Sequence, residues 1–154
     1  MTIADVKERL ASIVLETPGI KRAYACAPQS LPDSDLPLVV IFTGVSIWST
    51  ISDGLAEETR TYLIRLYVAP IQSGYDGEAE RRVEPYLDTL RAAILKHPHL
   101  GNSLTGETLP GVRECVYNGD TGIAVLPYAG QNYLGAELRV NVSTFVTYDI
   151  ASYE

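Results

Sequence analysis

Two segments with strand patterns meet at Asp53–Gly54, and this junction constrains the fold of the 154-residue chain more than any other feature. Before it, "LVVIF" at 38–42 has the length and apolar content of a strand covered on both faces. After it, residues 58–69 alternate between apolar and polar side chains. Because Asp-Gly favours the tight turn between antiparallel strands, the pattern predicts a hairpin over 38–69 whose tip, 45–58, projects beyond the sheet. The face expected to be buried carries Tyr62, Ile64, Leu66 and Val68.

Two helices are expected. Thr2 and Asp5 match a capping box, and apolar residues then recur at helical spacing until Pro18–Gly19 ends the first helix. The second helix is expected over 76–96, and Pro85 inside it is expected to cause a kink or a break. Its apolar stripe consists of Ala79, Val83, Leu87, Leu90 and Ile94.

Further strands complete the pattern. We expect a short strand within 20–27 and two short strands, at 112–117 and 122–127, joined through "NGDTG". The final strand has Leu138, Val140 and Val142 on one face and Arg139, Asn141 and Ser143 on the other, and its end at 143–149 is a candidate to pass beyond the sheet toward a partner.

The glycines before the final strand do not form a phosphate-binding loop, because a strand and not a helix follows them. Gly130 fits a turn, and Gly135 fits a bulge or a close approach of another backbone. The order of helix, strands, helix and strands predicts an α+β fold, with a mostly antiparallel sheet, two main helices on one face and the long projecting hairpin. Residues 1–154 are expected to form a single domain.

Residues suited to chemistry are few, so we predict no catalytic site, no metal site and no cofactor. His97 and His99 lie at the end of the second helix without further metal ligands at suitable spacing. Cys115 lies in an expected strand without a nearby base. The alternative is a small enzyme or ligand-binding domain that uses these three residues.

The charge distribution argues against a nucleic-acid binder. The formal net charge is −7, and no Lys or Arg lies between Arg22 and Arg60. This acidic stretch is either a solvated face or a surface to which DNA must not adhere. Its acidic residues are Asp33, Asp35, Asp53, Glu57 and Glu58.

No apolar run approaches the ~20 residues of a membrane span, and the N-terminus lacks the pattern of a secretory signal. We therefore expect synthesis in the cytosol and no membrane partner.

The expected hairpin tip carries the only tryptophan, Trp48, between Ile47 and Ile51 and close to Asp53. Aromatic anchors of this kind are enriched in protein–protein interfaces. Trp48 is thus either part of an interface or folded back onto the protein's own core.

Four segments together resemble the tail terminator, or tail completion, proteins of long-tailed bacteriophages. They are "PLVVIFTG", "TRTYLIRLYVA", "RRVEPYLDTLRAAILKHPHLG" and "PYAGQNYLGAELRVNV". The helix end "HPHLG" and the approach "YAGQNYLGAE" to the last strand carry most of the resemblance, which spans nearly the whole chain.

The resemblance implies a structural virion protein that forms a ring, typically a hexamer, at the head-proximal end of the tail tube. The ring ends tube polymerisation and joins the head–tail connector or stopper, and DNA passes through its lumen without specific binding. Asp53, Glu57 and Glu58 are then candidates for an acidic lumen, and the hairpin tip for a subunit or tube contact. The location would be the tail or neck of the virion, assembled in the host cytoplasm. A neighbouring neck or tail component is the alternative within this class.

Overall fold

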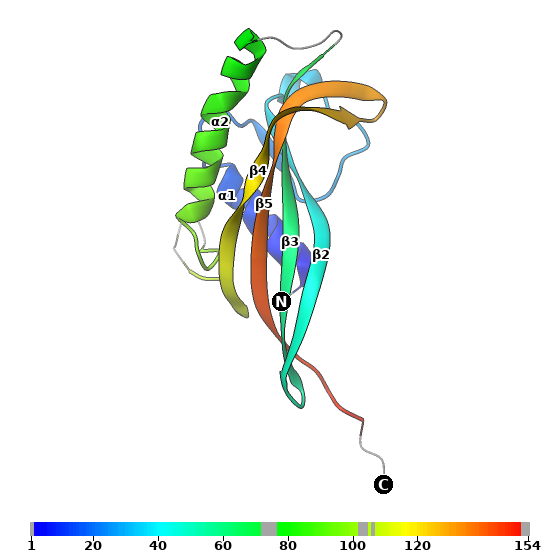
Figure 1. Ribbon diagram of the computed structural model, residues 1–154, viewed down its shortest axis with the longest axis vertical. Coiled ribbons are helices and arrows are strands. Elements are labelled where there is room, and N and C mark those ends of the chain that lie inside the picture. Colours follow the sequence, from blue (N-terminus) through cyan, green and yellow to red (C-terminus); the bar gives the residue numbers. More distant parts are fainter. Residues whose placement is uncertain (1, 72–76, 102–104, 106, 152–154) are drawn as a thin grey trace.

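A computed structural model describes residues 2–71, 77–101, 105 and 107–151. The helices are α1 (Ile3–Val14), the short 3-10 helix η1 (Asp33–Asp35) and α2 (Gly77–Leu95), and the strands are β1 (Arg22–Tyr24), β2 (Leu38–Ser52), β3 (Leu55–Pro70), β4 (Val112–Tyr128) and β5 (Gln131–Thr147). The strands form one sheet in the order β1-β2-β3-β5-β4 (Figure 1). Only β1 and β2 are parallel, so the predicted α+β fold with a mostly antiparallel sheet is confirmed.

The long hairpin forms as β2 and β3, which pair antiparallel from Leu38–Tyr67 to Ser52–Leu55. Gly54 has a φ of +80°, which the turn requires and glycine adopts without steric cost. The end of the hairpin extends beyond both helices (Figure 1). It is not a two-stranded arm, however, because β5 follows β3 down to the pair Leu55–Thr147. Residues 143–147 therefore lie within the protein's own sheet, and only the chain after them leaves it.

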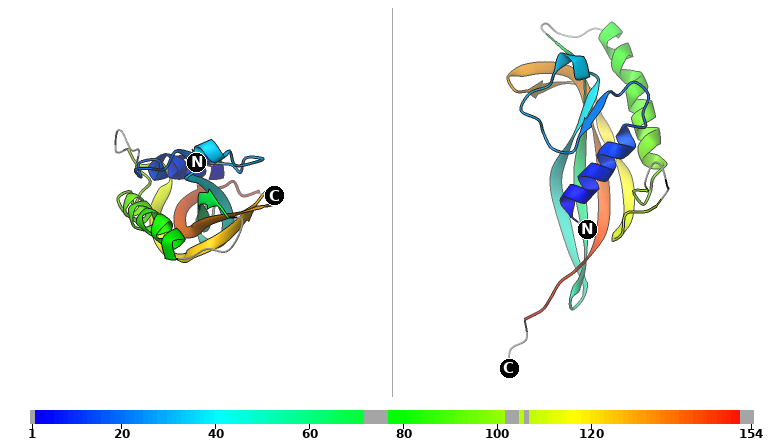
Figure 2. Two further views of the ribbon diagram at one scale, coloured as in Figure 1. Left: turned by 90° about the horizontal axis from the view of Figure 1, so that it is seen from above. Right: turned by 180° about the vertical axis from the view of Figure 1, so that it is seen from behind.

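Both helices pack on the same face of the curled sheet (Figure 2). The capping box at the start of α1 is present, with Thr2 Oγ1 accepting from the Asp5 amide and the Asp5 carboxylate accepting from the Thr2 amide. The apolar stripes of the two helices then cover the sheet residues that the alternation assigned to the buried face. This core includes Val6, Leu10, Ile13, Val83, Leu90, Ile64, Leu66, Leu138 and Val140.

The opposite face of the sheet is covered only in part. The chain before β2 crosses its upper end, where Leu31 and Leu36 pack with Leu38, Val40 and Tyr67. The Tyr67 ring meets the rings of Tyr128 and Tyr133 edge to face, at centroid distances of 5.5 and 5.7 Å. Below this second cluster, no helix or strand of the described residues covers the sheet.

β4 corrects the prediction of two short strands, because residues 112–128 form one continuous strand. The segment "NGDTG" does not reverse the chain. Register shifts between Tyr117 and Asp120, and between Asp120 and Ile123, each place one extra residue in β4 against β5. Gly119 and Gly122 take up these bulges with φ values of +96° and +71°.

Pro85 does not break α2, so the predicted interruption is wrong; the helix is continuous from Gly77 to Leu95. The proline removes one amide donor, which would have bonded the carbonyl of Arg81. Pro85 and Arg81 are both exposed, so water can take the place of that donor.

Candidate assembly surface

The outer edge of β2 is open along most of its length. β1 pairs only with Leu38, Val39 and Val40, through the register Arg22–Leu38 to Tyr24–Val40. From Ile41 to Ser52, no strand in the described part of the chain pairs with this side of β2. The backbone groups on that side have no strand partner, and the Gly44 carbonyl in this stretch accepts from Arg60 Nη1 at 2.9 Å; β2 is an outer strand at this end of the sheet in Figure 1.

The open edge lacks most of the features that normally protect an edge strand. Lysines, prolines and shortness discourage pairing with another chain. Residues 42–52, "FTGVSIWSTIS", contain neither a charge nor a proline. Val45 and Ile47 are 78% and 74% exposed, and Trp48 and Ile51 are about half exposed. Two irregularities are present, register shifts between Thr43 and Ser46 and between Thr50 and Ser52. This stretch, Thr43–Ser52, is called the open edge below.

The other edge of the sheet, formed by β4, is capped. The Cys115 amide donates to the carbonyl of Pro98 at 2.6 Å, and His99 Nδ1 donates to the carbonyl of Arg113 at 2.9 Å. The β4 edge is thus capped at Arg113 and Cys115, whereas no such cap is described along the open edge of β2.

The structure separates the predicted residues of the hairpin tip. Ile47 pairs across the sheet with Thr59 and lies on the face opposite the helices. Trp48 lies on the helix side, 6.3 Å from the Tyr148 ring between centroids. It faces a groove between α1 and the sheet end, and Ile51 and Asp53 lie at the turn. The groove is also lined by Thr2, Ile3, Val6, Glu58, Tyr62, Thr144 and Val146. Trp48 therefore neither enters the core nor extends fully into solvent.

The candidate lumen residues are not one acidic cluster. Glu57 and Glu58 are adjacent in β3 and so point to opposite faces of the sheet. Arg113 Nη1 lies 3.0 Å from Glu57 Oε1, and Arg60 Nε lies 3.2 Å from Glu58 Oε1. Asp53 lies in the exposed turn. An arginine accompanies each of the two glutamates, so neither contributes an isolated negative charge to its face.

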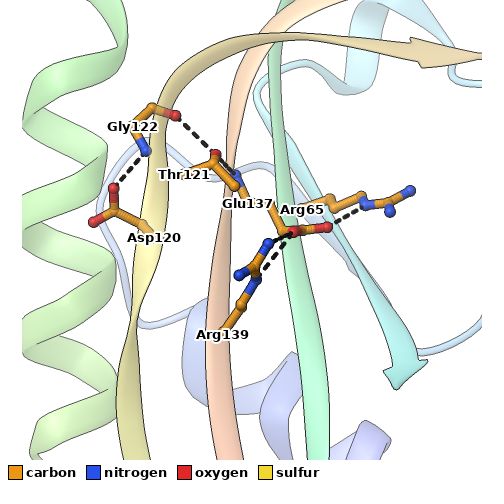
Figure 3. A network of polar contacts seen from close by, with 6 residues as sticks. All are labelled: Arg65, Asp120, Thr121, Gly122, Glu137 and Arg139. Atoms are coloured by element: carbon orange, nitrogen blue, oxygen red, sulfur yellow. Dashed lines mark hydrogen bonds and ion pairs between the residues drawn. The ribbon is translucent and has the colours of Figure 1, made fainter. Parts of the chain in front are cut away.

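A polar network that the sequence patterns did not reveal lies on the sheet face away from the helices (Figure 3). Glu137 pairs across the sheet with Arg65, and its Oε1 accepts from Arg65 Nε at 2.8 Å. Its Oε2 accepts from Arg139 at 3.2 Å, and its amide donates to Thr121 Oγ1 at 3.1 Å. The Arg65 guanidinium also lies 4.6 Å from the centre of the Phe42 ring. The alternation of β3 and β5 offers a signal for this pair, because opposite charges on the same face of two neighbouring strands can form an ion pair. Whether Arg65 and Glu137 meet depends on the register between the two strands.

Two hydrogen-bonded side-chain pairs continue this face toward the tip. Thr59 and Ser143 share a hydrogen bond of 2.9 Å, and Thr61 donates to Asn141 at 2.8 Å. These polar groups satisfy one another within the sheet. The residues free to meet a partner here are the exposed apolar ones, among them Val45, Ile47, Val116 and Phe145.

The residues of the alternative enzymatic interpretation are dispersed. His97 Nε2 lies 3.0 Å from Glu16 Oε1 at the end of α1, whereas His99 bonds the β4 backbone. Cys115 is buried, and this burial raises the pKa of its thiol to about 12. The thiol therefore stays protonated at neutral pH. Among the residues that the structure describes, no group of three or more His, Cys, Asp or Glu side chains is placed to hold a metal ion.

The two cysteines are expected to differ sharply in reactivity. In the native protein at pH 8, iodoacetamide should alkylate the exposed Cys26 and leave the buried Cys115 unmodified until urea is added. Peptide mass spectrometry measures both sites. Raising the pH above 9.0, the usual thiol pKa, should also destabilise the fold, because the unfolded thiol then ionises while the folded thiol remains protonated up to about pH 12. Equal labelling of both cysteines in native protein would contradict the buried position.

No protein-family model matches this chain, and no curated protein is significantly similar to it. Across the described residues, no helix has the length and apolar character needed to cross a membrane.

Proposed function

We propose that this protein is a non-enzymatic assembly component, a tail terminator that forms a ring on the head-proximal end of a phage tail tube. The observation that carries the proposal is the open edge of β2, which is long, uncharged and rich in exposed apolar residues. In a lone molecule such an edge invites aggregation, whereas in an assembly it serves as an interface.

The two unlike edges of the sheet fit ring formation. A ring needs heterologous contacts, in which one surface of a subunit meets a different surface of the next and rotation closes the circle. The open edge of β2 and the capped edge of β4 lie at opposite sides of the sheet, so each subunit offers two different surfaces to its two neighbours in a ring. The proposed ring is a hexamer of this chain, and its further partners are the tail tube protein and the head–tail connector or stopper.

The net charge of the whole chain supports the proposed lumen, whereas the individual candidate residues Glu57 and Glu58 do not. A net charge of −7 disfavours adhesion of DNA to a ring through which it passes. Because Glu57 and Glu58 are each accompanied by an arginine and lie on opposite faces, they cannot both line one lumen surface. Asp53, in the exposed turn, remains the candidate without a described ion pair.

Electron microscopy of the purified protein with and without tail tubes tests the proposal. We expect rings seated on tube ends, and overlong or headless tails when the protein is missing during assembly. If tails assembled without the protein have normal length and join heads normally, the proposal is contradicted. Cross-links to the head connector alone, with none to the tube protein, would instead assign the chain to the neighbouring stopper.

A further inference from the structure

The last described residues leave the sheet and extend away from the body of the protein. The Tyr148 amide donates to the Gly54 carbonyl at 3.0 Å, which is the last hydrogen bond described along the chain. Asp149, Ile150 and Ala151 are all exposed and belong to no helix or strand. Figures 1 and 2 show this segment passing the hairpin turn and pointing beyond it. The described segment Asp149–Ala151 is called the arm below.

The arm carries an exposed apolar side chain, Ile150, that the rest of the protein does not cover. Ile150 is 54% exposed, and a branched aliphatic residue of this kind gains free energy when it is buried. The arm continues the direction of β5, which at the tip runs away from the protein. To reach the open edge of its own β2, it would have to reverse direction and pass around the hairpin turn.

The open edge accepts an extended segment, and β1 demonstrates how. Only three residues long, β1 adds to β2 at Leu38–Val40 without a hairpin connection. A second short segment could continue the line of β1 along Thr43–Ser52 and satisfy the exposed backbone groups there. The three arm residues equal β1 in length and, extended, span about 10 Å, so they can pair with part of the open edge, whose ten residues span about 33 Å.

We infer that the arm of one copy adds as a strand to the open edge of the next copy. This inference deepens the proposed ring and rests on that proposal for its head-to-tail direction. The contact would place Ile150 beside the exposed side chains of Val45, Ile47 and Ile51. Asp149 meets no like charge there, because residues 42–52 carry none. Each subunit donates one arm and receives one, so every contact is of the same heterologous kind.

Two variants separate the two halves of this contact. The first ends at Tyr148 and keeps the open edge; the second carries Ile47→Lys and Ile51→Lys and keeps the arm. Lysines at exposed edge positions disfavour strand addition and leave the fold intact. A matched control carries Leu95→Lys and Val125→Lys, two exposed apolar positions on α2 and β4. Circular dichroism verifies that all four proteins are folded.

Light scattering coupled to size exclusion, with native mass spectrometry, reports the assembly state. We expect the wild-type chain and the control to form the same closed oligomer, and each of the two variants to be monomeric. An equal mixture of the two variants should form a dimer and nothing larger, because only one arm and one open edge remain compatible. A mixture that stays monomeric, a truncated variant that still assembles, or a monomeric wild-type chain would each overturn the inference.

Failure of this inference can be told apart from failure of the proposed function. Rings of the truncated chain that still cap tail tubes would refute arm exchange and leave the terminator role standing. Arm-dependent oligomers that do not bind tubes and do not affect tail length would support arm exchange and refute the terminator role.

Discussion

Replacing Gly135 with alanine is expected to destabilise the fold by about 3 kcal/mol or more. A Cβ built at Gly135 would lie 1.8 Å from the carbonyl oxygen of Leu66 and 2.9 Å from its carbonyl carbon. Both are backbone atoms at the centre of β3, so no side-chain rotation relieves the clash. The register shift between Tyr67 and Ala69 lies beside this approach, and the two strands would have to separate. Urea unfolding followed by circular dichroism measures the loss.

Gly130→Ala is the matched control for that experiment. Gly130 lies in the turn directly before β5, which begins at Gln131. Nothing lies within 4 Å of a Cβ built at Gly130. Its φ of +82° makes alanine cost about 1–2 kcal/mol through backbone strain alone. Equal unfolding midpoints for the two variants would show that the contact with Leu66 is not what requires glycine at 135.

Leu10→Ala is expected to cost about 2–5 kcal/mol, because it removes a fully buried side chain between α1 and the sheet. Leu10 belongs to the main core with Val6, Val14 and Ile64. The cavity left behind would be lined by side chains from both a helix and strands that cannot collapse together, since the sheet is held by its hydrogen bonds. Thermal and urea unfolding measure the change.

Leu15→Ala provides the comparison within the same segment. Leu15 directly follows α1 and is 47% exposed, so its truncation should cost less than about 1 kcal/mol. A large loss at Leu15 together with a small loss at Leu10 would mean that α1 presents a different face to the sheet.

Local patterns were sufficient to predict the helices and the hairpin. A 3.6-residue repeat identifies the buried stripes of α1 and α2, and Asp53–Gly54 identifies the reversal between β2 and β3. These features depend on neighbours in the chain, which the sequence displays directly. The capping box at Thr2 belongs to the same class.

Predictions failed where the outcome depended on a partner strand or on solvent. The glycines of "NGDTG" are equally suited to a turn or to bulges, and pairing of β4 with the regular strand β5 selects bulges. Pro85 is tolerated because its side of α2 is exposed. The residues that surround these positions in the chain reveal neither the partner strand of "NGDTG" nor the solvent exposure of Pro85.

The candidate site shows the same division. The sequence identified an apolar tip around Trp48, but not that Ile47 and Trp48 face opposite sides or that one edge of the sheet is open. The pairing of Glu137 with Arg65 joins residues 72 positions apart, and it needed the register of β3 with β5.

The sequence by itself determined the two helices, the long hairpin, the fold class and the buried faces of these elements, because alternation and helical spacing are local properties of the chain. Only the tertiary structure decided the strand order, the bulges and the contrast between a capped and an open edge. Those features arise from hydrogen bonds between distant segments, whose register and neighbours are chosen by packing of the whole molecule.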